Sequence, residues 1–210
     1  MKLLLLPLLL VAELRAQPLN LVFFGDSLTE GVPHFNGEVD TYPFQTAQPF
    51  PGSTYTKLGY RGQTTDYLRS HLDAFLFALL KSNYQNVLVL WAGTNDCASG
   101  PLECAQPAYQ NLSAMARAAR AAGWKVVAVT IIARGNYFAD AAHQSQFPAN
   151  QTALNSLLRT SQDFDAVVDP APLLMDPTNT NYFWDGCHLW PSGYQIVAQL
   201  VIGALKSLGQ

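Results

Sequence analysis

The residues best suited to chemistry in this sequence are a serine near its start and a histidine near its end. Ser27 comes two residues after Gly25, which closes a short apolar run and lets the chain turn sharply. His188 follows Asp185 by three residues. Histidine takes and returns a proton near neutral pH, and an aspartate at this spacing can hold its far ring nitrogen. The sequence therefore predicts Ser27 as nucleophile, His188 as base and Asp185 as the orienting carboxylate.

Two further segments could stabilise negative charge on a reacting carbonyl. Asn95 follows a second apolar run, so its amide could donate a hydrogen bond to an oxyanion. Gly62 precedes a helical pattern and could bring a bare backbone N–H against the carbonyl. Each motif also has a structural interpretation. Gly-Asp-Ser is a common helix cap, an Asp before a His can cap a turn, and asparagine tolerates turns.

The elements that must position these residues alternate along the chain. Continuous apolar runs, typical of strands covered on both faces, occupy 19–24, 86–91 and 124–132, with a weaker run at 165–168. Helical spacing covers 65–81, 107–122, 154–158 and 191–208. Residues 32–57, 133–149 and 169–184 fit neither pattern. The order predicts an α/β fold with a central parallel sheet in three layers.

In this order, the motifs resemble the four blocks of the SGNH hydrolases, also called GDSL esterases and lipases. The blocks read Gly25-Asp26-Ser27-Leu28, Gly59-Tyr60-Arg61-Gly62, Gly93-Thr94-Asn95-Asp96 and Asp185-Gly186-Cys187-His188. The resemblance implies a flavodoxin-like sandwich with about five strands. It also implies an acyl-enzyme mechanism, with an oxyanion hole made of Ser27 N–H, Gly62 N–H and the Asn95 amide. One departure is Gln63, where many members of the family have an acidic residue. The backbone donor at Gly62 does not depend on that side chain, and Gly59 is assigned no role beyond the turn.

The bulk composition narrows the function classes. The 210 residues carry a net charge of −3 without a basic cluster, so we expect no nucleic-acid partner. The start of the chain, Met1-Lys2 followed by an apolar stretch to Ala12, is too short to span a bilayer and is typical of a signal peptide. We place cleavage after Ala16, with Ala12 as the alternative, and expect one domain over 17–210. A buried first helix is the competing interpretation.

Three cysteines remain in that domain. Cys97 could pair with Cys104 across a small loop, or with Cys187, which would tie two site segments together. These cysteines and His188 could bind zinc, but the paired Cys-x-x-Cys spacing of such sites is missing. We therefore expect no metal and no other cofactor.

The predicted function is a secreted or periplasmic serine ester hydrolase. Aromatic residues in 32–57 and 182–190 favour short-chain or carbohydrate-linked acyl groups, with acetyl as the first choice. A lipase or lysophospholipase using the same residues is the alternative, and a non-catalytic glycan-binding domain is the third. We expect a monomer with a small-molecule or carbohydrate ester as its partner and no stable membrane anchor.

Overall fold

The computed structural model describes residues 17–33 and 36–209; the predicted signal peptide, 1–16, lies outside them. Five parallel strands form one sheet in the order β2-β1-β3-β4-β5. They are β1 (Leu19–Gly25), β2 (Thr54–Gly59), β3 (Gln85–Trp91), β4 (Lys125–Val129) and β5 (Ala166–Val168). This strand order is that of flavodoxin-like folds, so the predicted fold class is confirmed.

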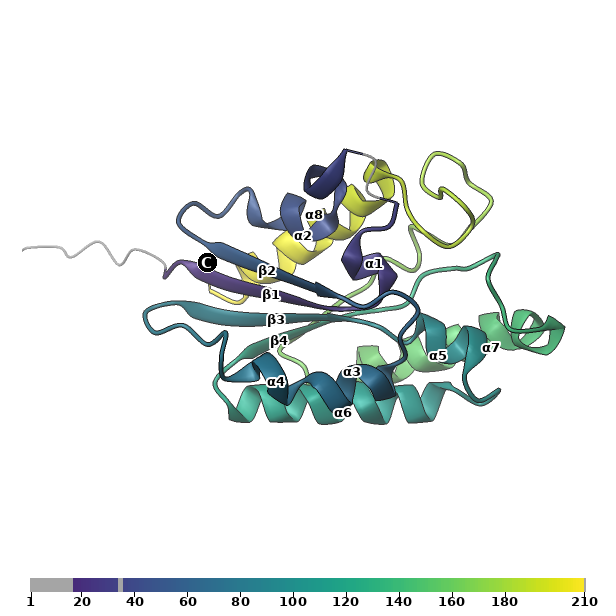
Figure 1. Ribbon diagram of the computed structural model, residues 1–210, viewed down its shortest axis with the longest axis horizontal. Helices are drawn as coiled ribbons and strands as arrows, with labels where there is room; N and C mark the ends of the chain where they lie inside the picture. Colours follow the sequence, from purple (N-terminus) through teal and green to yellow (C-terminus); the bar gives the residue numbers. More distant parts are fainter. Residues whose placement is uncertain (1–16, 34–35, 210) are drawn as a thin grey trace, which may run out of the picture.

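Helices cover both faces of the sheet (Figure 1). One face carries α1 (Ser27–Glu30), α2 (Tyr42–Ala47) and α8 (Pro191–Ser207), with the 3-10 turn η1 (Gly37–Asp40) beside α2. The other carries α3 (Thr65–His71), α4 (Asp73–Leu76), α5 (Thr94–Ser99), α6 (Ala105–Ala121) and α7 (Ala141–Thr160). Among the described residues, no helix combines the length and apolarity that crossing a membrane requires.

The strand side chains divide between two apolar cores. In β1, Val22 and Phe24 pack toward α3 and α6, whereas Leu21 and Phe23 pack toward α2 and α8. All four are fully buried. Because successive side chains point to opposite faces, a strand with helices on both faces is apolar at nearly every position; the buried Asn20 of β1 is an exception, and its Nδ2 donates a hydrogen bond to Asn86 Oδ1 in β3. Burial on both faces explains the continuous apolar runs from which the strands were predicted.

The structure corrects three predictions about the elements. The end of the stretch 32–57, expected to be irregular, belongs to the edge strand β2 (Thr54–Gly59), whose side chains are only half-buried. Helix α7 begins at Ala141 rather than near 154, because Asp140 caps it by accepting a hydrogen bond from the N–H of His143. The single helix predicted over 65–81 is divided into α3 and α4 at Leu72. The irregular stretch 169–184 was predicted correctly, since no helix or strand begins between β5 and α8.

Candidate active site

Ser27 is the first residue of α1, immediately beyond the carboxyl end of β1. The carboxylate of Asp26 caps this helix by accepting a hydrogen bond from Leu28 N at 2.9 Å. Gly25 makes the sharp turn possible, because a Cβ there would lie 2.2 Å from the carbonyl oxygen of Trp91. Ser27 is 5% exposed, so its hydroxyl sits at the floor of the site rather than on an open surface.

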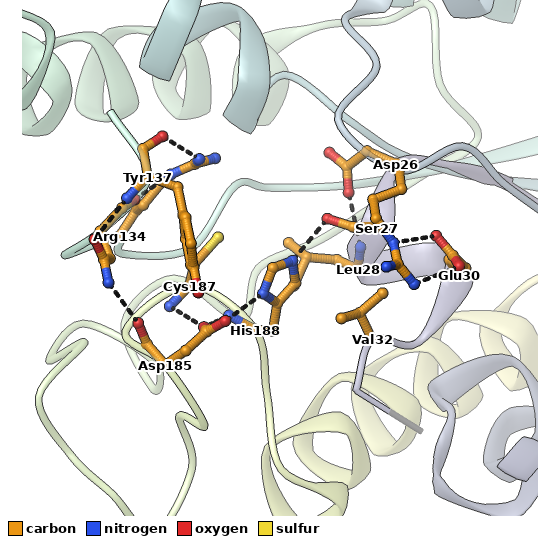
Figure 2. Close-up of polar contacts among 12 residues, drawn as sticks. Asp26, Ser27, Leu28, Glu30, Val32, Arg134, Tyr137, Asp185, Cys187 and His188 are labelled. Carbon is orange, nitrogen blue, oxygen red and sulfur yellow. Dashed lines mark hydrogen bonds and ion pairs between the residues drawn. The ribbon is translucent and has the colours of Figure 1, made fainter. Parts of the chain in front are cut away.

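A hydrogen-bonded line joins Ser27 to the segment that precedes α8 (Figure 2). His188 Nε2 lies 3.0 Å from Ser27 Oγ, and His188 Nδ1 lies 2.7 Å from Asp185 Oδ2. The other carboxylate oxygen of Asp185 accepts from the backbone N–H groups of Cys187 at 3.0 Å and His188 at 2.7 Å. Burial alone raises the pKa of Asp185, but the hydrogen bonds from His188 and Cys187 outweigh it and leave that pKa below its ordinary value. Asp185 therefore stays ionised beside the ring.

Two of the three predicted oxyanion donors, Gly62 and Asn95, line the same pocket as Ser27 and His188. Gly62 has a φ of +73° in a turn that Gln63 N–H closes onto Tyr60 O at 3.1 Å. A Cβ at Gly62 would meet nothing, so the left-handed backbone, not crowding, requires the glycine. Asn95 lies in the first turn of α5, and its Nδ2 donates to Gln63 O at 3.0 Å. An amide nitrogen carries two hydrogens, so it can also donate to a substrate oxygen.

Asp96 holds the start of α3, which directly follows the Gly62 turn. Its buried carboxylate accepts hydrogen bonds from Thr65 N at 3.0 Å and Thr65 Oγ1 at 2.5 Å, at the start of α3. Together with the Asn95 bond to Gln63, this contact ties α5 to the turn that carries Gly62. Two sequence blocks more than 30 residues apart thus form one rigid unit.

The predicted catalytic residues and oxyanion donors line a pocket of about 420 Å³. Its lining residues are Ser27, Val32, Arg61, Gly62, Asn95, Arg134, Tyr137, Trp184, Asp185, Cys187 and His188. All five residues predicted for the site are among them. A larger pocket, about 600 Å³, lies at the opposite end of β1, around Pro18, Phe50 and Lys206. It contains no histidine or acidic side chain to activate a nucleophile, so the smaller pocket is the candidate site.

Burial raises the pKa of two other titratable groups near Ser27, Asp26 and Cys187. It raises the pKa of Asp26 to about 7, although the hydrogen bond from Leu28 opposes it. The second oxygen of Asp26, Oδ2, is buried without a hydrogen-bond partner among the described residues. Burial also raises the pKa of the Cys187 thiol to about 12, which keeps it protonated and a poor nucleophile. Of Ser27 and Cys187, Ser27 is the one whose side chain is hydrogen-bonded to a base, the ring of His188.

Sequence reasoning did not single out Arg134 and Tyr137, which form one wall of the pocket. Both follow β4, in a stretch predicted only as irregular. Tyr137 has a φ of +59°, which a tyrosine rarely adopts, and its ring centre is 5.9 Å from that of His188. A hydrogen bond with Asp185 raises the pKa of Tyr137. The sequence contains one indication of their role, which is that both follow a predicted parallel strand, and polar residues in that position lie at the ligand-binding edge of the sheet.

The structure also answers two questions left open by the sequence. Cys97 and Cys104 form a disulfide, and Cys187 is a buried free cysteine. Gly59 has a packing role, because a Cβ there would lie 2.2 Å from the backbone nitrogen of Glu30 in α1. Within residues 17–33 and 36–209, no group of three or more His, Cys, Asp or Glu side chains is arranged to hold a metal ion.

Comparison with known proteins gives a family match and a set of structural likenesses. The model of the GDSL-like lipase/acylhydrolase family matches residues 23–196. A GDSL-like lipase from Bacteroides thetaiotaomicron superposes with a TM-score of 0.69 at 20% identity, covering 92% of this chain and 93% of that one. A carbohydrate acetylesterase from Sinorhizobium meliloti gives a TM-score of 0.68 at 16% identity, covering 90% and 99%. No curated protein matches the sequence.

Proposed function

The chain belongs to the GDSL-like lipase/acylhydrolase family and is a carboxylic ester hydrolase, and from this premise we propose that Ser27, His188 and Asp185 are its catalytic residues. One observation carries the proposal: the continuous hydrogen-bonded line from Ser27 Oγ through His188 to Asp185. This arrangement is that of a serine nucleophile, its general base and the group that orients the base.

The reaction follows from that arrangement. Ser27 Oγ attacks the ester carbonyl carbon while its proton passes to His188 Nε2, and Asp185 stabilises the imidazolium that forms. The tetrahedral intermediate then collapses, and the leaving alcohol takes the proton from His188. A water molecule, activated by His188 in the same way, releases the acid from the acyl-enzyme and restores Ser27.

The oxyanion of the tetrahedral intermediate needs donors that are already in place. We assign the backbone N–H groups of Ser27 and Gly62 and the Nδ2 of Asn95 to this role. The support is their position around one pocket and the contacts that hold the Gly62 turn rigid. Donors fixed before the reaction stabilise developing charge without reorganisation, and removing one typically lowers kcat about 10²- to 10³-fold.

The pocket favours short acyl groups, and we propose acetyl esters on carbohydrates as the substrate class. Val32 is the one aliphatic side chain among the lining residues that the structure describes, so the pocket offers little aliphatic surface to a long acyl chain. Tyr137 and Trp184 place aromatic surface at the site, which can stack on a sugar ring. The structurally similar carbohydrate acetylesterase from Sinorhizobium meliloti is consistent with this class.

The nucleophile is tested by labelling. A fluorophosphonate should modify the purified protein once, and mass mapping should place the adduct on the peptide containing Ser27. Ser27→Ala should abolish both the adduct and hydrolysis of p-nitrophenyl acetate. Ser156→Ala removes an exposed hydroxyl on α7, outside the pocket, and should change neither. Hydrolysis that survives Ser27→Ala would disprove the assignment.

The substrate class needs a separate measurement. We expect kcat/KM for p-nitrophenyl esters to fall as the acyl chain lengthens beyond about four carbons, and acetylated xylan to release acetate. Preference for long acyl chains would favour a lipase or lysophospholipase and overturn the substrate proposal. It would leave the assignment of Ser27 intact.

We further propose that residues 1–16 are a signal peptide and that the enzyme acts outside the cytoplasm. The basic start and short apolar stretch described above support this. Amino-terminal sequencing of protein collected from the medium or periplasm should give Gln17 first. Retention of Met1 in the exported protein would contradict it.

A further inference from the structure

Arg134 lies beside the proposed oxyanion hole but has no part in the mechanism above. Its guanidinium donates three hydrogen bonds: Nη1 to Asn95 Oδ1 at 3.1 Å, Nε to Asn136 O at 2.8 Å and Nη2 to Tyr137 O at 2.5 Å. Figure 2 shows the arginine beside Tyr137, across the pocket from Ser27. The side chain therefore connects Asn95 on α5 with the loop after β4.

The charge of Arg134 is not used in an ion pair. No carboxylate among the described residues lies within ion-pairing distance of it, and each of its hydrogen bonds goes to an amide or carbonyl oxygen. A half-buried cation without an acidic partner is unusual, because burying charge is costly unless it is compensated. The charge of Arg134 opposes the burial that raises the pKa of Asp26 and of Cys187, and its hydrogen bond to another side chain goes to the amide oxygen of Asn95.

We propose that Arg134 is a positioning residue that orients and polarises the Asn95 amide for donation to the oxyanion. This inference rests on the proposed function, in which Asn95 is an oxyanion donor. The two ends of the amide have partners of opposite kinds: Arg134 can only donate, and Gln63 O can only accept. The oxygen of Asn95 must therefore face the arginine and the nitrogen must face the Gly62 turn.

The positive charge adds to this orientation. A charge-assisted hydrogen bond to the amide oxygen draws electron density from the nitrogen and makes its N–H a stronger donor. Losing one charge-assisted hydrogen bond that stabilises the transition state lowers a rate roughly 10- to 100-fold. A lysine would keep the charge but could not supply the planar, three-point contact.

A double-mutant cycle tests the coupling. Asn95→Ala, Arg134→Gln and the double variant are compared with the parent protein by kcat for p-nitrophenyl acetate and by the rate of fluorophosphonate inactivation. We expect Asn95→Ala to lower kcat about 10²-fold or more and Arg134→Gln to lower it roughly 10- to 100-fold. In the Asn95→Ala background, Arg134→Gln should cost less than about threefold, because the group it acts on is gone.

Controls separate this mechanism from a loss of structure. Arg117→Gln removes a guanidinium paired with Asp163, outside the pocket, and should leave kcat unchanged. Arg134→Lys should fold, as judged by its thermal transition, and fall between parent and Arg134→Gln. It replaces Arg134→Gln in the cycle if the glutamine variant does not fold.

The outcomes distinguish this inference from the proposed function. Equal losses from Arg134→Gln in both backgrounds, or no loss in the parent, would overturn the positioning role while leaving Asn95 as a donor. A normal kcat in Asn95→Ala alone would refute the oxyanion assignment, and the inference with it, whatever Arg134 does.

Discussion

Replacing Asp185 with asparagine would test the catalytic assignment sharply, because the surrounding hydrogen bonds dictate how the new amide sits. One oxygen of Asp185 accepts two backbone N–H groups, from Cys187 and His188, at 3.0 and 2.7 Å. Only the amide oxygen of an asparagine can replace that acceptor. The amide nitrogen must then face His188 Nδ1, which now has to accept a hydrogen bond. The ring proton moves to Nε2, the atom 3.0 Å from Ser27 Oγ.

A ring protonated on Nε2 cannot take the proton of Ser27. In a serine–histidine–aspartate triad, this change of tautomer lowers kcat about 10⁴-fold, or about 5.4 kcal/mol at 1.36 kcal/mol per decade. We expect that loss for Asp185→Asn with p-nitrophenyl acetate at pH 7.5. The KM should change little, because the substitution conserves the shape of the side chain.

Asp176→Asn is the matched control. It lies in the same irregular segment, holds only the local turn at Thr178 and should retain full activity. Circular dichroism and the thermal transition of each variant establish that it is folded. A kcat for Asp185→Asn within about tenfold of the parent would refute the reasoning, since the tautomer would then not depend on Asp185.

Three predictions concern stability and are measured by urea or thermal unfolding. The pKa of Asp26 is about 7 in the fold against an ordinary value of 3.8, so the folded chain keeps a proton that the unfolded chain releases. The free energy of unfolding should therefore decrease as the pH rises from about 4 to about 7. Asp26→Asn should not show this decrease, and a difference in stability between variant and parent that is the same at every pH would contradict the prediction. Removing the disulfide with Cys97→Ser/Cys104→Ser should cost about 2.5 kcal/mol, from loop-closure entropy over a separation of 7 residues. An unchanged melting temperature would show that the constraint is already supplied by packing. Gly59→Ala forces a Cβ to within 2.2 Å of the α1 backbone and should cost about 3 kcal/mol or more, whereas Gly203→Ala on α8 meets nothing and should be neutral or stabilising. Similar melting temperatures for these two variants would refute the packing role of Gly59.

The sequence was sufficient where burial on both faces constrained it. Strands β1 and β3 are apolar at nearly every position because helices cover both of their faces, and that pattern is unambiguous. Strand β2 lies at the edge of the sheet and includes Thr54, Thr56 and Lys57 in half-buried positions. Thr54, Tyr55 and Thr56 favour strands, but this short mixed run has none of the continuous apolar character from which the central strands were predicted.

Helix α7 was underestimated for a related reason. Its first half lies at the surface, with Phe147 its only buried side chain before Leu154, and Pro148 interrupts its interior. A helix with few core contacts has little apolar periodicity for a pattern to detect. Its start was nonetheless encoded locally, in the capping aspartate, Asp140.

The residues of the site also fall into those that could be predicted from the sequence and one that could not. Ser27, Gly62, Asn95, Asp185 and His188 could be named from the sequence because their motifs occur in a fixed order at strand and helix ends. Arg134 could not, since its partners on α5 and in its own loop are set by how the turn after β4 folds back. Its function depends on three-dimensional neighbours that no short motif encodes.

The contact between Ser27 and His188 spans 161 residues of sequence. Contacts so far apart cost loop-closure entropy and are made only once most of the intervening chain has been organised. Any partly folded form in which the segment around His188 has not docked holds a serine without a base, and such a serine is as inert as one in a peptide. The chain therefore gains its reactivity late in folding, and recovery of ester hydrolysis during refolding reports completion of the tertiary structure rather than formation of its helices or its sheet.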